Sequence, residues 1–241
     1  MAEQSPAPFT VNTIWHGIIA ALRPDFGVLF ALVAPFTLLV SMVVELFGPS
    51  PPTTIAEFTP KVVVMLLLIP SVIGAIGQLA LTWLIASPGG TPAHAIGVGI
   101  RALPGYLLAI LLITPATSLG LLLLVVPGLY LFARMFLVGP AMVIESLGPI
   151  AALRRSWVLT AINSWTIVLF LVLALLFVLG AAVLASGVGA ALGLLLTAIG
   201  LKSVGGFVAA LVAATISTLF TMASAAAGVD IYRRVSGALP G

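Results

Sequence analysis

Long apolar segments alternate with short polar or proline-rich segments along most of the chain. Six apolar segments are about 20 residues long, which is the length that an α-helix needs to cross the hydrocarbon core of a bilayer. They cover approximately residues 26–47, 62–86, 105–126, 129–145, 164–186 and 204–228. Short connections join them in pairs, so the pattern predicts an all-α integral membrane protein with six transmembrane helices arranged as three hairpins.

A short segment with the spacing of an amphipathic helix precedes each predicted hairpin. The first covers residues 9–22, with Ile14 and Ile18 on its apolar face, and the others begin at Thr91 and at Gly148. Thr91 followed by proline is typical of a helix start. We expect all three segments to lie in the membrane interface. Their similarity to one another is slight, so an internal repeat and three independent origins both remain open.

Proline and glycine positions set the expected boundaries. We expect a disordered tail over residues 1–8, a single membrane domain over 9–236 and a short tail over 237–241. Pro70 predicts a kink in the second span. Residues 187–202 are apolar but interrupted by glycine, which favours a loop with a re-entrant or interfacial helical piece.

Composition narrows the class of protein. Hydrophobic residues make up 62% of the 241 residues and charged residues only 6%, whereas soluble domains carry about 25% charged residues. This excludes a soluble globular domain. Nine Lys and Arg residues are too few for a phosphate-binding surface, so nucleic acid is not an expected partner. The absence of cysteine excludes disulfides and thiolate chemistry.

No arrangement of residues that carries chemistry is apparent in the chain. The two histidines, His16 and His94, lie in different predicted short helices and lack metal-ligand spacing. No predicted span pairs a serine with a histidine or lysine, and no phosphate-binding loop motif is present. We therefore expect neither enzymatic activity nor a cofactor.

The basic residues are distributed unevenly between the two sets of connections. If the N-terminus is cytosolic, the inner set holds six arginines and the outer set only Lys61 and Lys202. The six arginines are Arg23, Arg101, Arg154, Arg155, Arg233 and Arg234. This bias predicts that both termini are cytoplasmic. All four tryptophans then lie near the cytosolic interface.

Six residues are candidates for a structural or interaction role: Arg134, Glu145, Arg154, Arg155, Trp157 and Gln78. Arg134 falls within the fourth span, where a charge is costly. It is also less than two turns from the predicted outer end, so we expect it to reach the outer headgroups. We expect Glu145 to pair with Arg154 or Arg155 across the Gly148-Pro149 turn, although a solvated acid at a helix end is the alternative. Gln78 is expected to form a packing hydrogen bond to a neighbouring helix.

The segment PGLYLFARMFLVGPAMVIESLGPIAALRRSWVLTAINSW at residues 127–165 resembles a bacterial six-span family of inner-membrane proteins. The family also occurs as the membrane domain attached to some glycerophosphoryl diester phosphodiesterases. The matching features are Pro127-Gly128, Arg134, Pro140, Glu145, Ala152, Arg154, Arg155, Ser156, Trp157 and Trp165, and more loosely Tyr232-Arg233-Arg234. The resemblance implies a location in the bacterial inner membrane. It implies no activity, because in the fused members hydrolysis belongs to a separate domain that is absent here.

Two functions are consistent with these features. The first is a non-enzymatic membrane protein that binds lipids, anionic ones in particular, or other membrane proteins including further copies of itself at its cytosolic interface. The second is a small transporter or permease component, for which Arg134 and the proline and glycine positions could form a polar path.

Overall fold

The computed structural model describes residues 9–49, 52, 54, 57–198 and 202–237, and in this part of the chain it contains helices and no strand. The first hairpin comprises α2 (Phe26–Ala34), η1 (Pro35–Leu39), α3 (Val40–Phe47), α4 (Pro60–Val63), η3 (Val64–Leu68) and α5 (Ile69–Ala86). The second comprises α6 (Pro92–Leu123), α7 (Val125–Met135) and α8 (Val138–Ile144), and the third α10 (Ser164–Ala198) and α11 (Lys202–Ser236). The short helices are α1 (Val11–Leu22) and α9 (Pro149–Leu159).

Six stretches of the described chain are long and apolar enough to cross a membrane, which confirms the predicted fold class. They are Phe26–Val44, Pro60–Ala86, Pro92–Leu123, Val125–Ile144, Ser164–Ala181 and Leu211–Ser236. Many of their large apolar side chains face outward, and Leu122 is 82% exposed. Such a surface is stable only where lipid replaces water around it.

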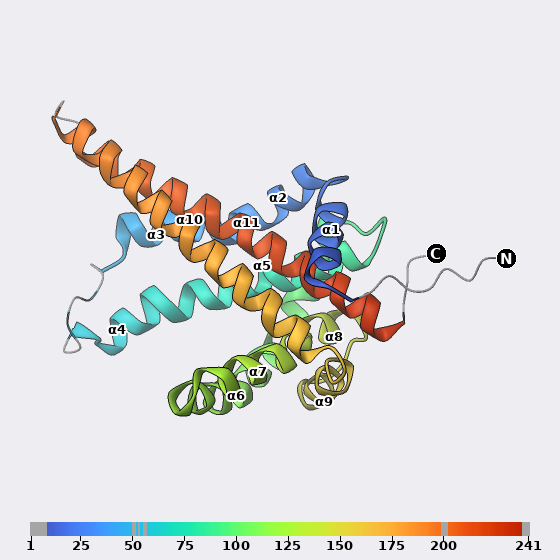
Figure 1. Ribbon diagram of the computed structural model, residues 1–241. Coiled ribbons are helices and arrows are strands. Elements are labelled where there is room, and N and C mark those ends of the chain that lie inside the picture. The colour runs from blue at the N-terminus through green and yellow to red at the C-terminus, as the bar shows by residue number, and fades with distance from the viewer. Residues whose placement is uncertain (1–8, 50–51, 53, 55–56, 199–201, 238–241) are drawn as a thin grey trace.

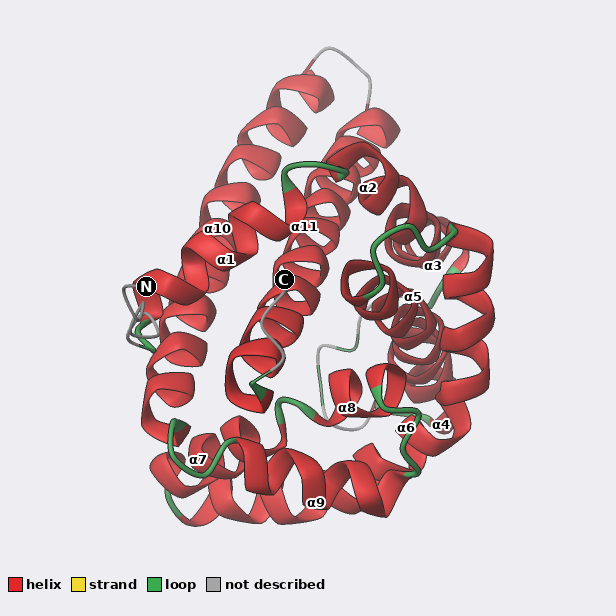
Figure 2. Cartoon of the chain, turned by 90° about the vertical axis from the view of Figure 1, so that its right-hand side faces the viewer, coloured by secondary structure: helices red, strands yellow, loops and turns green. Residues whose placement is uncertain are grey.

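The helix ends separate into two groups (Figure 1). The end of α3, the turn between α6 and α7 and the end of α10 lie on the left of the view. The start of α1, helix α9 and the end of α11 lie on the right, and Figure 2, which looks onto that end, shows α9 running across the view. We call this second group the α1/α9 end.

Two π-helical turns interrupt the first hairpin. One is η1, which begins at Pro35, and the other is η3, which ends directly before Ile69-Pro70. Proline has no backbone N–H and its ring collides with the carbonyl four residues earlier, so a wider turn before Pro70 relieves that collision. The predicted irregularity at Pro70 is therefore present as η3.

The second predicted short helix is not a separate element, which corrects that expectation. Thr91 does cap a helix, because its side chain accepts a hydrogen bond from the backbone N–H of His94. However, this helix continues without a break through Pro104 to Leu123 as α6. The prediction of a separate short helix therefore holds for α1 and α9 only.

The breaks around the fourth span also differ from the expected positions. The chain turns at Leu124, three residues before Pro127, so that Pro127 falls in the first turn of α7, where no backbone N–H is needed. A second break separates α7 from α8 at Phe136 and Leu137. Pro140 explains this break, because its ring would collide with the carbonyl of Phe136 in a continuous helix.

The third hairpin is longer than predicted. Helix α10 has 35 residues and runs through 187–198, so the loop predicted at 187–202 is wrong over this part; residues 199–201 lie outside the described residues. Glycine is tolerated better in transmembrane helices than in soluble ones, and α10 packs along α11. A helix of 35 residues is about 52 Å long, which exceeds the roughly 30 Å of hydrocarbon in a bilayer.

Two groups of buried side chains form the core. The larger joins α1 with α7 to α11 and includes Ile14, Leu137 and Ile231. The smaller joins α2, α5, the start of α6 and α11, and includes Val33 and Leu81. Helix α11 belongs to both groups, so it holds the first hairpin against the rest of the molecule.

Candidate functional site

Arg134 lies buried near the end of α7, beneath the ring of Trp157 in α9. Only 5% of its surface is exposed. Its guanidinium carbon lies 4.1 Å from the centre of the Trp157 ring and 5.9 Å from that of Tyr130. Its Nη1 donates a hydrogen bond of 3.3 Å to Ser164 Oγ, whereas its buried Nε has no hydrogen-bond partner among the described residues.

Side chains from α9 and the turn after it hold the backbone of Arg134 in place. Its carbonyl oxygen accepts a hydrogen bond of 2.7 Å from Ser156 Oγ and one of 3.2 Å from Thr160 Oγ1. Both hydroxyls are fully buried. The last carbonyls of a helix lack hydrogen-bond partners within the helix. These two hydroxyls supply the missing hydrogen bonds at the end of α7. They also fix the direction in which the Arg134 side chain leaves the backbone.

This position corrects the expectation that Arg134 reaches the outer headgroups. Its partners Trp157 and Ser164 belong to α9 and to the first residue of α10. These elements lie at the α1/α9 end, which is the opposite end from the turn between α6 and α7 (Figure 1). The cause is the short length of α7: its 11 residues span about 16 Å, so Arg134 is already close to the far end of the regular helix.

Among the described residues, no carboxylate lies within ion-pair distance of Arg134. Neither the Arg155–Glu145 pair nor the Arg234–Asp230 pair involves it. A guanidinium keeps its charge in proteins, and burying an unpaired charge is costly. Cation–π contact with Trp157 recovers part of this cost.

An exposed aromatic and apolar surface covers Arg134. Trp157 is 41% exposed and Trp165 is 65% exposed, and the Trp165 ring lies 5.8 Å from that of Tyr130. Arg154 lies on α9, three residues before Trp157. Its side chain is exposed and forms no ion pair or hydrogen bond with another described residue. We call Arg134, Tyr130, Trp157 and Trp165 the Arg134 site.

The predicted contact between Glu145 and the α9 arginines is confirmed, and Arg155 is the partner. Arg155 Nε and Nη2 both donate to Glu145 Oε1, at 3.0 and 2.8 Å. The hydroxyl of Tyr232 in α11 donates to the same oxygen. Partial burial tends to raise the pKa of Glu145, but the hydrogen bonds from Tyr232 and Arg155 and the charge of Arg155 outweigh it and lower this pKa.

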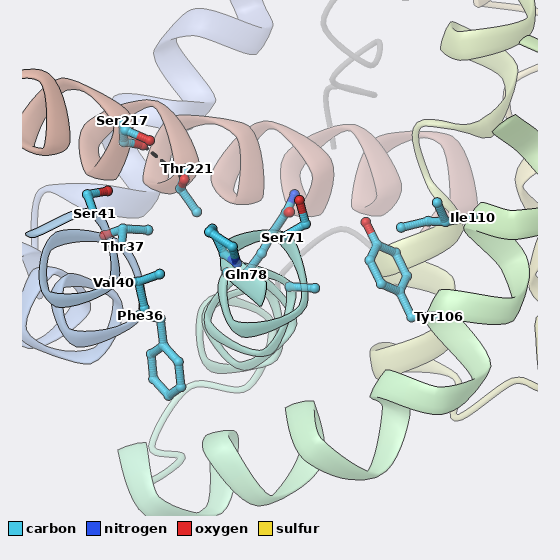
Figure 3. A pocket seen from close by; sticks show the side chains of 13 residues that line it. Phe36, Thr37, Val40, Ser41, Ser71, Gln78, Tyr106, Ile110, Ser217 and Thr221 are labelled. Atoms are coloured by element: carbon cyan, nitrogen blue, oxygen red, sulfur yellow. Dashed lines mark hydrogen bonds between the residues drawn. The ribbon is translucent and has the colours of Figure 1, made fainter. Parts of the chain in front are cut away.

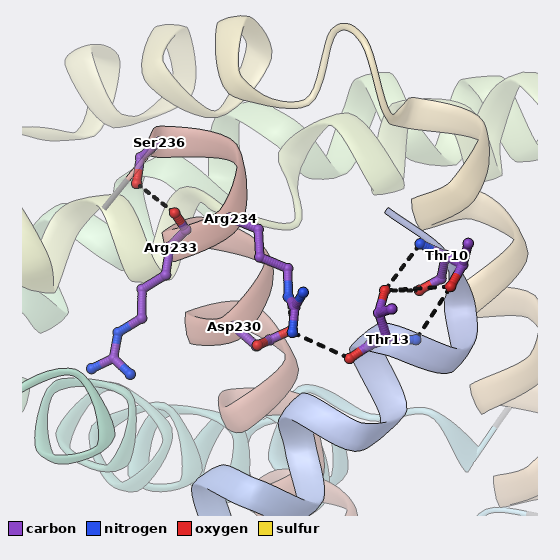
Figure 4. Close-up of polar contacts among 6 residues, drawn as sticks. All are labelled: Thr10, Thr13, Asp230, Arg233, Arg234 and Ser236. Atoms are coloured by element: carbon purple, nitrogen blue, oxygen red, sulfur yellow. Dashed lines mark hydrogen bonds and ion pairs between the residues drawn. The ribbon is translucent and has the colours of Figure 1, made fainter. Parts of the chain in front are cut away.

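The last turns of α11 bind three other parts of the α1/α9 end. Arg233 donates to the carbonyls of Ile85 and Ala86 at the end of α5, both at 3.1 Å. Arg234 pairs with Asp230 at 2.7 Å and donates to the carbonyl of Thr13 in α1 (Figure 4). Together with Tyr232, these residues connect α1, α5 and α8 to α11. The sequence indicates that Tyr232-Arg233-Arg234 is distinctive, but not which helices these side chains reach.

Gln78 lies apart from the Arg134 site. Its side chain forms no hydrogen bond with another described residue, so the expected packing hydrogen bond is absent from this part of the structure. It lines a pocket of about 300 Å³ between four spans (Figure 3). Sequence reasoning missed this pocket, because its other polar residues come from segments that are far apart along the chain.

The structure adds no metal-binding arrangement. Within the described ranges, no group of three or more His, Asp or Glu side chains lies close enough together to hold a metal ion. Comparisons with protein-family models, with curated proteins and with solved structures find no match for this chain. The resemblance to the six-span inner-membrane family therefore stays a prediction that rests on residues 127–165.

Proposed function

We propose that this chain is a non-enzymatic membrane protein that binds the headgroups of anionic lipids at the Arg134 site. The observation that carries the proposal is the buried guanidinium of Arg134, which has no carboxylate beside it and an Nε without a partner among the described residues. A phosphate group would supply the missing negative charge and accept hydrogen bonds from the guanidinium N–H groups that do not bind Ser164.

The surroundings of Arg134 support a lipid rather than a soluble ligand. Trp157 and Trp165 present rings to the outside, and tryptophan is typical of the zone where lipid headgroups meet hydrocarbon. Val158 and Ile162 beside them are 61% and 94% exposed. Exposed Arg154 adds a second positive charge, and each basic residue near an anionic surface contributes about 1 kcal/mol to binding.

Replacing Arg134, with a second arginine as control, separates a binding role for Arg134 from a structural one. Arg134→Met keeps a long side chain against Trp157 but removes the charge. Because the buried charge is unpaired, we expect the melting temperature of this variant without added lipid to equal or exceed that of the unchanged protein. Arg101→Met is the matched control, since Arg101 is an exposed arginine of α6 outside the site.

The measurement is thermal unfolding in a nonionic detergent with added short-chain phosphatidylglycerol or, for comparison, zwitterionic phosphatidylcholine. Phosphatidylglycerol should raise the melting temperature of the unchanged protein and of Arg101→Met, but not that of Arg134→Met. If Arg134→Met keeps the full response to phosphatidylglycerol, the lipid binds elsewhere and the proposal is wrong.

We also propose a location in the bacterial inner membrane with both termini in the cytoplasm, on the basis of the arginine distribution. The Arg134 site then faces the cytoplasmic leaflet, which carries the negative surface potential. The exposed tryptophans would also suit a second membrane protein or another copy of the chain. Purification in a lipid-preserving polymer, followed by identification of what accompanies the protein, distinguishes lipid from protein partners.

A transporter component is the second candidate function. The observation that favours it is the polar pocket around Gln78, which lies among the spans. Uptake and efflux assays in proteoliposomes test this function directly.

A further inference from the structure

The pocket around Gln78 collects polar side chains from four spans. Thr37 and Ser41 come from the first span, Ser71 and Gln78 from α5, Tyr106 from α6 and Thr221 from α11. Figure 3 shows α5 between Tyr106 on one side and the residues of the first span and α11 on the other. At about 30 Å³ per molecule, the volume of about 300 Å³ equals that of about ten waters.

Most of these polar groups lack a partner among the described residues. The side chains of Ser41, Ser71, Gln78 and Tyr106 form no hydrogen bond with another residue of this part of the chain. Thr37 bonds to Val33 and Thr218, and Thr221 donates to the carbonyl of Ser217. A polar group without a partner is costly inside a membrane. Ser71 is exposed and the other three side chains are half-buried, so a ligand in the pocket can reach all four and supply the missing hydrogen bonds.

The pocket lies well inside the predicted hydrocarbon layer. Gln78 is eight residues before the end of α5 and Thr37 is eleven residues after the start of α2, which corresponds to about 12 and 16 Å along the helices. Half of the hydrocarbon thickness is about 15 Å. These two side chains therefore lie near the middle of their spans.

The backbone around the pocket is irregular on two sides. Thr37 lies within the π-helical turn η1, and Ser71 follows shortly after the π-helical turn η3. π-Helical turns occur frequently at functional sites. Each of the two helices thus carries its irregular turn next to the pocket.

We propose that this pocket binds an uncharged molecule, or the uncharged headgroup of a lipid. The hydroxyl groups of this ligand would form hydrogen bonds with the polar side chains of the pocket. None of the described residues that line the pocket is charged, so an ionic group would enter without compensation. Hydroxyl and amide side chains both donate and accept hydrogen bonds, which matches a ligand with several hydroxyls. This site is separate from the Arg134 site, and the inference does not depend on the proposed function.

The test uses a single cysteine in this cysteine-free chain. Ser71→Cys places a thiol in the pocket, and Leu112→Cys, at an outward-facing apolar position of α6 that does not line the pocket, is the matched control. The labelling rate by neutral N-ethylmaleimide is measured in nanodiscs. The Ser71→Cys variant should react faster than the Leu112→Cys variant, because a thiolate forms more readily in polar surroundings than in hydrocarbon.

Three added molecules identify the ligand class. Dioctanoylglycerol and glycerol share the uncharged hydroxyl chemistry but come from the bilayer and from water, respectively. Dioctanoylphosphatidate carries a charge. If either neutral molecule slows labelling of Ser71→Cys, by about tenfold at ten times its Kd, the result supports the proposal. The molecule that protects shows whether the ligand enters from the bilayer or from water. No slowing by either, or equal slowing by the phosphatidate, overturns it. Disulfide-linked dimers of Ser71→Cys also overturn it, because a second copy would then fill the pocket.

Changes at Gln78 and Tyr106 test the hydrogen-bonding groups themselves. Gln78→Leu, combined with Ser71→Cys, should abolish protection by the neutral molecule and leave the melting temperature equal or higher. Tyr106→Phe, also combined with Ser71→Cys, should weaken protection against labelling, because it removes one hydroxyl and leaves the shape of the pocket almost unchanged. Thr114→Val, a matched change on α6 outside the pocket, should alter neither. If protection persists in both pocket variants, the side chains do not bind the ligand and the proposal fails.

Discussion

The Glu145 carboxylate binds side chains from two helices at once. Arg155 of α9 and Tyr232 of α11 donate to the same oxygen. The contact with Arg155 could be predicted, because only a short turn separates the two residues. The contact with Tyr232 could not, since Tyr232 is 87 positions further along the chain and only the complete fold brings the two residues together. Arg134 was misplaced for a related reason: the expectation assumed a continuous fourth span, whereas the chain breaks directly after it.

Glu145 should make the stability of the α1/α9 end depend on pH. Its pKa is lower in the folded protein than the roughly 4.3 of an unfolded chain. The stabilisation is therefore fully present above the unfolded pKa and is lost as the pH falls through the folded pKa. Because the Arg155 and Glu145 side chains are 38% and 30% exposed, we expect a contribution of about 1 kcal/mol or less.

The measurement compares melting temperatures of the unchanged protein and Glu145→Gln in detergent between about pH 7 and pH 3.5. The advantage of the unchanged protein should be largest near pH 7 and should shrink below about pH 5. Asp25→Asn is the control, since Asp25 is exposed and caps no helix through its side chain. A constant difference between the unchanged protein and Glu145→Gln over this range would contradict the prediction.

At the scale of elements, proline positions were more informative than glycine positions. Pro70 marked the π-helical turn η3, and Pro92 and Pro149 marked the starts of α6 and α9. Glycines misled at residues 187–198, because packing along α11 stabilises a helix that a soluble protein would interrupt. The short helix expected from Thr91 and the third span likewise form one element, because α6 continues through Pro104. Propensity decides an element only where tertiary packing does not.

Gly17 permits the close approach of α1 to α11. A β-carbon at this position would overlap the carboxylate of Asp230, which pairs with Arg234. Gly17→Ala should therefore push α1 outward and disturb that ion pair, at a cost of about 1–3 kcal/mol. In contrast, Gly27 in α2 has open space around it, so Gly27→Ala should be neutral or slightly stabilising. Thermal unfolding of both variants checks this, and an equal response at the two positions would refute it.

At the scale of the whole molecule, the six-span pattern could be predicted because hydrophobic length alone specifies a membrane helix. The sequence did not indicate which spans meet. Helix α11 contacts α1, α2, α5 and α10, and its final turns bind side chains or carbonyls at the ends of three other elements. Helix α11 thus joins the two earlier hairpins to each other.

The orientation of the bundle is the final prediction. The arginines of the α1/α9 end, including Arg154, Arg155, Arg233 and Arg234, should face the cytoplasm. Because the chain has no cysteine of its own, single cysteines at Ser50, Ser87, Ser146 and Ser236 can be labelled in intact cells with an impermeant maleimide. Only the cysteine at Ser50, in the connection after α3, should react from outside; the other three should react only after the membrane is permeabilised. External labelling at Ser146 would place Glu145 and α9 outside and invert the proposed orientation, and labelling at Ser236 alone would mean that α11 does not return across the membrane.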